Sequence, residues 1–166
     1  MPTISRVEEM CLNISKCIAA AKLFSMPLIY SEQYPQGLGP TVEELLCELK
    51  DAKRFEKSAF SCFGESDFSE YIKQQKIDSL LIVGIEAHVC VYQTALDALG
   101  KDIDVFIAAD AVSSSKEFDA QVALENLREQ GAVISTFESL FLQMLGSSKH
   151  PLFKSMSSIL KRKSLT

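Results

Sequence analysis

The sequence contains no tryptophan, and among its 166 residues there are only two histidines, seven glycines and five prolines. The two histidines, His88 and His150, lie far apart in the chain, so we expect no metal site. No apolar run approaches the roughly 18 residues of a membrane span, and the start has no basic segment followed by an apolar stretch. These absences argue against a membrane partner and an export signal, and they predict a cytoplasmic location.

Signatures of nucleotide and nucleic-acid binding are also missing. The chain has no Gly-x-Gly-x-x-Gly or Walker sequence, which argues against a Rossmann-like nucleotide binder. The net charge is -5, so the electrostatics do not favour a nucleic-acid partner, and the basic residues at 161–163 are expected to be a solvated tail. The five cysteines form no Cys-x-x-Cys pair, which predicts reduced thiols in a cytosol.

The composition and the order of apolar patterns predict one folded domain over residues 1–166. Apolar residues make up 47% of the chain and charged residues 23%, the balance of a globular protein. Strands are expected at about 28–30, 80–83, 105–109 and 132–135, with partly extended backbone over 55–63. Helices are expected at about 7–25, 44–49, 66–75, 89–99, 117–130 and 137–145. This alternation predicts an α/β fold, a three-layer Rossmann-like and mostly parallel sheet with helices on both faces.

Several helix starts carry a hydroxyl residue followed three positions later by glutamate, the pattern of a capping box. The pairs are Ser5 with Glu8, Thr41 with Glu44, and Ser114 with Glu117. Met26-Pro27 is expected to end the first helix, because the residue before proline avoids the helical region. Gly100 and Gly131 are expected to stop two later helices.

Ligands of open parallel sheets bind at the carboxyl ends of the strands, which limits the candidate site residues. Glu32 and Gln33 follow one predicted strand, and Cys90 follows the most apolar strand through a glycine-containing turn. Cys90 then falls in the first turn of a helix, where free N–H groups and the helix dipole favour a thiolate and can hold an oxyanion. The alternative is a buried cysteine that packs as a small apolar residue.

Lys57 and His88 are the other candidates near Cys90. Lys57 lies between Phe55 and Phe60, where it can stabilise a thiolate or relay a proton, although a lysine with its stem on apolar surface is the more common case. His88 is two residues from Cys90, and residues two apart on a helix do not face each other. We therefore expect His88 to be a bystander or a substrate-side contact, together with Glu32 and Gln33.

Three stretches carry a family resemblance: LLIVGIEAHVCVYQTALDAL at 80–99, YSEQYPQGLGPTV at 30–42 and FEKSAFSCF at 55–63. Together they resemble the isochorismatase-like cysteine hydrolases, and the second is similar to the animal isochorismatase domain-containing proteins in particular. The resemblance implies a six-stranded sheet and an Asp–Lys–Cys triad, of which Lys57 and Cys90 match two positions. It also implies a cis peptide between Ile85 and Glu86, and an oxyanion hole at the N–H groups of Glu86 and Cys90.

The resemblance also implies the chemistry. Isochorismatases proper lack a cysteine at this position, whereas nicotinamidases and carbamoylsarcosine hydrolases carry one and cleave amide-type C–N bonds. We therefore expect a cysteine hydrolase for a small molecule with a C–N bond other than a peptide bond, which works through an acyl-enzyme. The segment SEQYPQGLG lacks the nicotinamidase metal residues, so neither a metal nor another cofactor is expected. Family members are commonly homo-oligomers, and we expect the same here.

The family's triad aspartate ends a first, central strand that precedes the first helix, and no aspartate precedes Asp51 in this sequence. We therefore expect the chain to be truncated at its N-terminus relative to the family, and the absence of that aspartate favours the alternative to an active hydrolase. The alternative function, from another class, is a catalytically silent binding or interaction protein that keeps the fold.

Overall fold

Strands and helices alternate along the chain in the computed structural model, which describes residue 4 and residues 6–165. The strands are β1 (Ile29–Gln33), β2 (Lys53–Lys57), β3 (Ser79–Ile85), β4 (Asp104–Ser113) and β5 (Val133–Ser135). The helices are α1 (Val7–Leu23), α2 (Pro35–Leu38), α3 (Glu43–Leu46), α4 (Ser66–Gln74), α5 (Tyr92–Leu99), α6 (Glu117–Glu129), α7 (Phe137–Leu145) and α8 (Phe153–Leu160). A 3-10 turn, η1 (Cys62–Gly64), and a π-helical turn, η2 (Ala87–Val91), complete the order.

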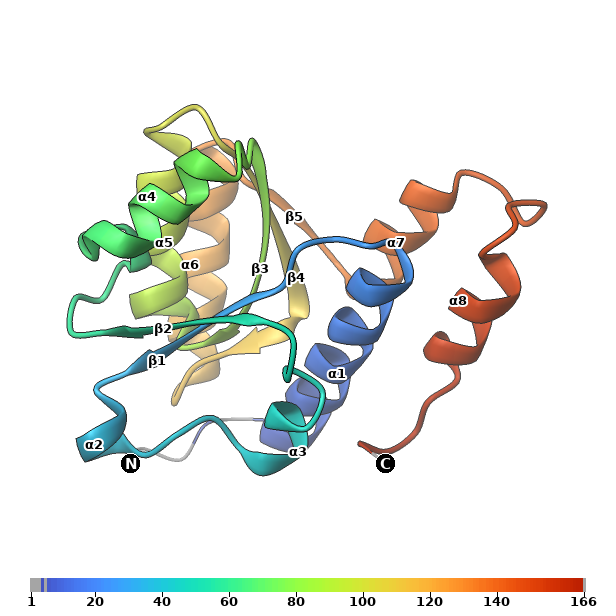
Figure 1. Ribbon diagram of the computed structural model, residues 1–166, viewed down its shortest axis with the longest axis horizontal. Helices are drawn as coiled ribbons and strands as arrows, with labels where there is room; N and C mark the ends of the chain where they lie inside the picture. Colours follow the sequence, from blue (N-terminus) through green and yellow to red (C-terminus); the bar gives the residue numbers. More distant parts are fainter. Residues whose placement is uncertain (1–3, 5, 166) are drawn as a thin grey trace.

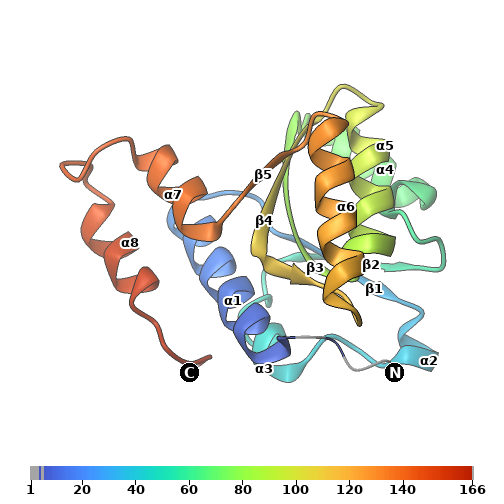
Figure 2. The same ribbon diagram turned by 180° about the vertical axis from the view of Figure 1, so that it is seen from behind.

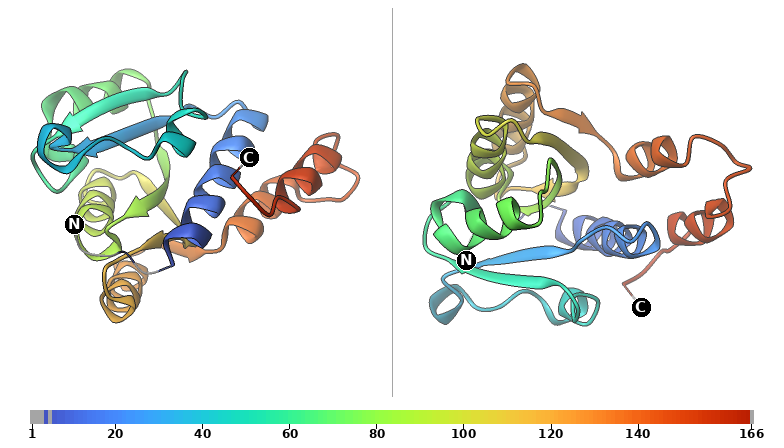
Figure 3. Two further views of the ribbon diagram at one scale, coloured as in Figure 1. Left: turned by 90° about the horizontal axis from the view of Figure 1, so that it is seen from below. Right: turned by 45° about the horizontal axis from the view of Figure 1, so that its top comes forward.

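The described strands form two parallel sheets, which Figure 3 shows as separate groups of ribbons. One sheet pairs β1 with β2, and the other has the order β3-β4-β5. Register places Gln33 opposite Lys57 in the first sheet and Leu81 opposite Phe106 in the second. The α/β class and the parallel pairing confirm the prediction. The resemblance implies six strands, whereas the described residues form five. No described strand lies between β1 and β3 and joins them by hydrogen bonds.

Helices cover both faces of the β3-β4-β5 sheet, as the alternation predicted (Figures 1 and 2). Successive side chains of a strand point to opposite faces, so Leu80 and Ile82 pack with α4, α5 and α6. Leu81 and Val83 pack with the cluster formed by α1, α3, α7 and α8. The continuous apolar run of β3 therefore fits a strand with apolar layers on both sides.

The predicted capping boxes are wrong at the two starts that the structure describes in full. Val42 is the N-cap of α3 and Lys116 that of α6, and neither makes a side-chain cap. Thr41 instead donates its N–H to Glu32, and the Ser114 hydroxyl contacts His88. Tertiary partners therefore take groups that a local pattern had assigned to helix caps. The third pair includes Ser5, which lies outside the described residues.

Helix α8 and the end of α1 also differ from the prediction. α1 ends at Leu23, three residues before Met26, and Ser25 has a φ of 56° in the connection to β1. α8 has no counterpart among the predicted helices; it packs against α1, and its Met156 is fully buried. Isolated eight-residue helices are marginal in water, so α8 depends on this contact for its stability. No helix among the described residues is long and apolar enough to cross a membrane.

Candidate active site

Three strand ends bring the principal side chains together. Gln33 is the last residue of β1 and Lys57 the last of β2, and the two are opposite each other in the parallel register. Cys90 lies in η2, which follows β3 in the other sheet. The carboxyl ends of parallel strands are where ligands of such folds bind. The structure therefore brings Gln33, Lys57 and Cys90 together, although Gln33 and Cys90 are 57 positions apart in the sequence.

Lys57 and Cys90 form the central contact of the site. The Lys57 Nζ lies 3.3 Å from the Cys90 Sγ, and Lys57 is only 6% exposed. Nζ also donates to the carbonyl oxygens of Phe60, at 2.9 Å, and Ala59, at 3.2 Å. The ammonium is therefore buried and also hydrogen-bonded to neutral backbone oxygens. An ammonium at this distance stabilises a thiolate over a thiol.

Cys90 lies in a π-helical turn rather than in the first α-helical turn that the sequence predicted. The Glu86 carbonyl oxygen accepts from the N–H groups of Val89, at 3.1 Å, and Val91, at 3.2 Å, and α5 begins only at Tyr92. Wide turns of this kind occur often at functional sites. The Ile85–Glu86 peptide bond is cis, which confirms the turn that the resemblance implied. The oxyanion role of the Glu86 and Cys90 N–H groups stays a prediction.

Two side chains of this turn are tied to the connection between β4 and α6. The Glu86 Oε1 accepts from the Ser115 N–H at 3.0 Å, and the His88 Nδ1 lies 2.9 Å from the Ser114 hydroxyl. The described hydrogen bond of His88 thus goes to the residue just after β4 and not to Cys90. Both roles expected for His88, a bystander or a substrate-side contact, stay predictions.

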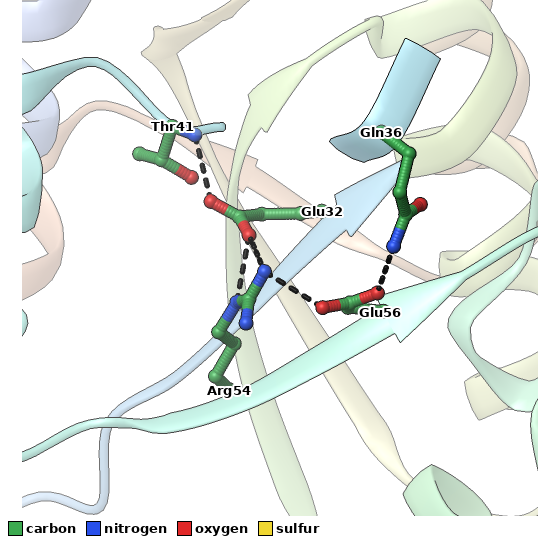
Figure 4. A network of polar contacts seen from close by, with 5 residues as sticks. All are labelled: Glu32, Gln36, Thr41, Arg54 and Glu56. Carbon is green, nitrogen blue, oxygen red and sulfur yellow. Dashed lines mark hydrogen bonds and ion pairs between the residues drawn. The ribbon is translucent and has the colours of Figure 1, made fainter. Parts of the chain in front are cut away.

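Glu32 lies beside Gln33 in sequence, but its carboxylate belongs to a separate polar network (Figure 4). It accepts from the Thr41 N–H and from the Arg54 Nε, both at 2.7 Å, and Arg54 also pairs with Glu56 at 2.8 Å. Burial acts to raise the pKa of Glu32, but these hydrogen bonds and the Arg54 charge outweigh it and lower the pKa. The network fixes the connection after β1 onto β2. A substrate contact for Glu32 stays a prediction.

Glu65 is a structural residue of the site that the sequence analysis did not identify. Its Oε1 accepts from the N–H groups of Ser58, at 2.8 Å, and Ala59, at 3.0 Å, at the start of the loop that holds Lys57. These two backbone hydrogen bonds lower the pKa of Glu65, and the Lys57 charge adds a smaller effect. The sequence does show an acidic residue just after the extended segment that contains Lys57. It does not show that this carboxylate binds backbone N–H groups, because a residue pattern does not reveal backbone partners.

The strand ends also carry exposed apolar side chains. Tyr34 follows β1, Phe60 follows β2 and Ile85 ends β3, and all three are exposed. Two cavities, of about 140 and 200 Å³, are lined by residues other than Lys57 and Cys90. Cys90 itself is half-buried.

The described residues contain no cluster of three or more histidine, cysteine, aspartate or glutamate side chains able to hold a metal ion. The absence of a metal from the mechanism stays a prediction.

The protein is thus of the parallel α/β class, with a cysteine and a lysine in contact at its strand ends. An isochorismatase domain matches residues 2–139, and the chain belongs to the isochorismatase family. Isochorismatase domain-containing protein 2 of Xenopus laevis is 40% identical over 146 residues, which cover 88% of this chain and 70% of the relative.

Solved structures share the fold of this chain. The MAR1 ribonuclease from Caenorhabditis elegans matches with a TM-score of 0.89 and 35% identity, over 97% of this chain and 83% of that chain. The YcaC product of Escherichia coli, an octameric hydrolase of unknown specificity, matches with a TM-score of 0.85 over 92% of this chain and 75% of that chain. Its identity is 23%, so this likeness shows the fold alone.

Proposed function

We propose that this protein is a cysteine-dependent hydrolase of small amide-type substrates. The observation that carries the proposal is the 3.3 Å contact between the Lys57 ammonium and the Cys90 sulfur. A buried ammonium needs a compensating partner, and a thiolate supplies both the opposite charge and a nucleophile. The isochorismatase family, to which the chain belongs, supports hydrolysis as the reaction class.

The proposed reaction has two covalent steps. The Cys90 thiolate attacks the substrate carbonyl carbon, and the N–H groups of Glu86 and Cys90 stabilise the oxyanion. The C–N bond then breaks, the leaving nitrogen takes a proton from the Lys57 ammonium, and a thioester remains on Cys90. Water hydrolyses the thioester, which releases the acid, restores the thiolate and returns a proton to Lys57.

The side chains at the strand ends support a substrate with an apolar portion. Tyr34, Phe60 and Ile85 offer exposed apolar surface next to residues of the site. Among the described charged side chains, Lys57 is the one with a hydrogen bond to Cys90. Small uncharged amides with an aliphatic or aromatic acyl group are therefore the first substrates to assay. RNA belongs in the same assay, because one similar protein is described as a ribonuclease.

The alternative function is a catalytically silent binding protein. One observation favours it: the hydrogen bonds of Lys57 within the described residues go to Gln33, two backbone carbonyls and Cys90, and none goes to a carboxylate that can act as a base. A binding protein would retain the fold and the apolar strand ends without turnover.

The rate of thiol alkylation separates the two functions. Iodoacetamide is added at pH 7, and the masses of the peptides that contain Cys90 and Cys62 are followed with time. An activated nucleophile predicts Cys90 modification about tenfold or more faster than that of Cys62, whose thiol is hydrogen-bonded to the Ser31 hydroxyl. Equal, slow rates contradict the hydrolase. Among active preparations, Cys90→Ala must abolish amide turnover while Cys62→Ala retains it.

We also propose that the protein acts as a homo-oligomer in the cytosol. The octameric state of the YcaC relative supports self-association, and five free cysteines support a reducing compartment. Sedimentation of the natural protein tests the first point, and fractionation of cells tests the second.

A further inference from the structure

Glu86 makes hydrogen bonds with both its backbone and its side chain around the turn that carries Cys90. Its carbonyl oxygen accepts from the N–H groups of Val89, at 3.1 Å, and Val91, at 3.2 Å, the residues on either side of Cys90. Its carboxylate Oε1 accepts from the Ser115 N–H at 3.0 Å. One residue therefore shapes η2 through its carbonyl and ties the start of η2 to the β4–α6 connection through its side chain.

The Glu86 carboxylate is placed by a hydrogen bond rather than by an ion pair. The salt bridges among the described residues do not include Glu86. Its described side-chain partner is a backbone N–H, from which an amide oxygen can also accept. Glu86 is half-buried, so water competes less for this hydrogen bond than it does at an exposed position. The anchor therefore needs an acceptor at the right length, and it does not need a negative charge.

A second contact joins the same two segments of the chain. The His88 Nδ1 lies 2.9 Å from the hydroxyl of Ser114, the residue before Ser115, and η2 packs against α6. Neither contact uses the Glu86 side chain, so both remain when that side chain is shortened. We therefore expect loss of the carboxylate to let the start of η2 shift rather than to unfold the turn.

The two N–H groups assigned to the oxyanion both depend on Glu86 for their direction. One is the N–H of Glu86 itself, and an anchored side chain limits the rotation of that peptide unit. The other is the N–H of Cys90, which lies in the chain between the N–H groups of Val89 and Val91, and both of those bond to the Glu86 carbonyl. Oxyanion stabilisation requires donors about 3 Å from the place where the charge develops. A shift of η2 would therefore displace both donors together.

We propose that Glu86 is a positioning residue that aims the N–H groups of Glu86 and Cys90 at the oxyanion by anchoring η2 to Ser115. The proposal rests on the proposed function of the same site, because it concerns attack by Cys90 on a carbonyl carbon. It predicts that Glu86 controls acylation of Cys90, in which an oxyanion forms, and has little effect on alkylation, in which none forms. The ratio of the two rates is the quantity to measure, because the thiolate fraction of Cys90 affects both rates and cancels in their ratio.

Reaction with p-nitrophenyl acetate tests the proposal without the natural substrate. The thiolate attacks the ester carbonyl, the C–O bond breaks, p-nitrophenolate leaves, and an acetyl thioester remains on the sulfur. In the full chain at pH 7, the acylation rate of Cys90 is the release of p-nitrophenolate that Cys90→Ala lacks, and that of Cys62 is the release that Cys62→Ala lacks. Each rate is divided by the iodoacetamide alkylation rate of the same cysteine. Cys62 lies outside η2, so we expect the wild-type ratio at Cys90 to exceed that at Cys62 about tenfold or more.

Three variants then separate the acceptor from the charge of Glu86. Glu86→Ala removes the acceptor, and its ratio at Cys90 should fall about tenfold, because the oxyanion donors are displaced. Glu86→Gln keeps an oxygen acceptor at the same length and should retain most of the wild-type ratio. Glu125→Ala removes a negative charge at an exposed position of α6 and should leave the ratio unchanged. Near-UV circular dichroism checks folding. If Glu86→Ala does not fold, Glu86→Asp replaces it with the same expectation, because its carboxylate is one methylene short of the Ser115 N–H.

The outcomes are separable from those of the proposed function. A folded Glu86→Ala protein with the wild-type ratio overturns the role of Glu86, and so does a wild-type ratio at Cys90 no greater than that at Cys62. An equal fall in Glu86→Gln and Glu86→Ala also overturns it, because the role belongs to an acceptor and not to a charge. A slow wild-type Cys90 whose ratio still falls in Glu86→Ala contradicts the hydrolase but supports the role of Glu86.

Discussion

The side chains of Lys57 and Cys90 meet although one ends a strand of the first sheet, the other follows a strand of the second, and they lie 33 positions apart in the sequence. Lys57 ends β2, and Cys90 lies in the turn after β3. Their contact therefore links the two sheets at the strand ends, and it places the proposed nucleophile where the two halves of the fold join. Several measurable consequences follow from this arrangement and from the packing that supports it.

Replacement of Lys57 should remove the activation of Cys90. Lys57→Met keeps an unbranched apolar stem of similar length but removes the ammonium 3.3 Å from the sulfur. We expect alkylation of Cys90 at pH 7 to slow about tenfold or more, because the thiolate loses its opposite charge. Lys154→Met, at an exposed position of α8, is the matched control. Equal rates in Lys57→Met and the wild type would show that the contact does not activate the thiol.

The two cysteines of α1 should resist alkylation in the folded protein. Burial raises the pKa of both Cys11 and Cys17, and the nearby charges of Glu44 and Asp110, respectively, raise it further. Both thiols are thus protonated at neutral pH, and each is at most 6% exposed. Peptide mass mapping after iodoacetamide treatment at pH 7 should find them unmodified until a denaturant is added. Modification at the rate of the exposed Cys47 would contradict the packing of α1.

Acid should destabilise the protein through Glu32 and Glu65. The pKa of each carboxyl is lowered in the folded state, so their contribution to stability is complete above the ordinary value of about 4.3. It is lost as the pH falls through the lowered values, because the folded state then has to take up protons. Urea unfolding at pH 6 and pH 3 should show this loss.

The loss on acidification should be smaller in Glu32→Gln, which cannot titrate at this position. Glu125→Gln, at an exposed position of α6, serves as the control and should keep the wild-type difference between the two pH values. An equal acid-induced loss in Glu32→Gln and the wild type would remove Glu32 from this explanation.

The docking of α8 should contribute strongly to stability. Met156 is fully buried against the α1 cluster, so Met156→Ala should lower the free energy of unfolding by about 2–5 kcal/mol. Met144→Ala makes the same change on α7 at a side chain that is 49% exposed, and it should cost about 0.5 kcal/mol or less. Urea denaturation of the two variants measures both values. Similar, small losses would mean that α8 is not docked in solution.

Much of the fold was predictable because its signals are local. The apolar run of β3 and the pattern of α7 led to the observed elements, with α7 at the predicted 137–145. The α8 segment was missed because its stability comes from α1, which lies more than 100 residues earlier in the chain. The caps at Thr41 and Ser114 were misassigned because their partners, Glu32 and His88, come from other strands and turns.

The sequence by itself determined the alternation of strands and helices from β3 to α7, the family motifs and the identity of Cys90 and Lys57 as candidates, because side-chain periodicity and motif spacing are properties of the chain. Tertiary structure alone decided that the ammonium reaches the sulfur, and that the Gln33 amide faces both. Contacts of a few ångströms depend on how strands from two sheets are placed in space. Residue order does not encode that distance in any local pattern.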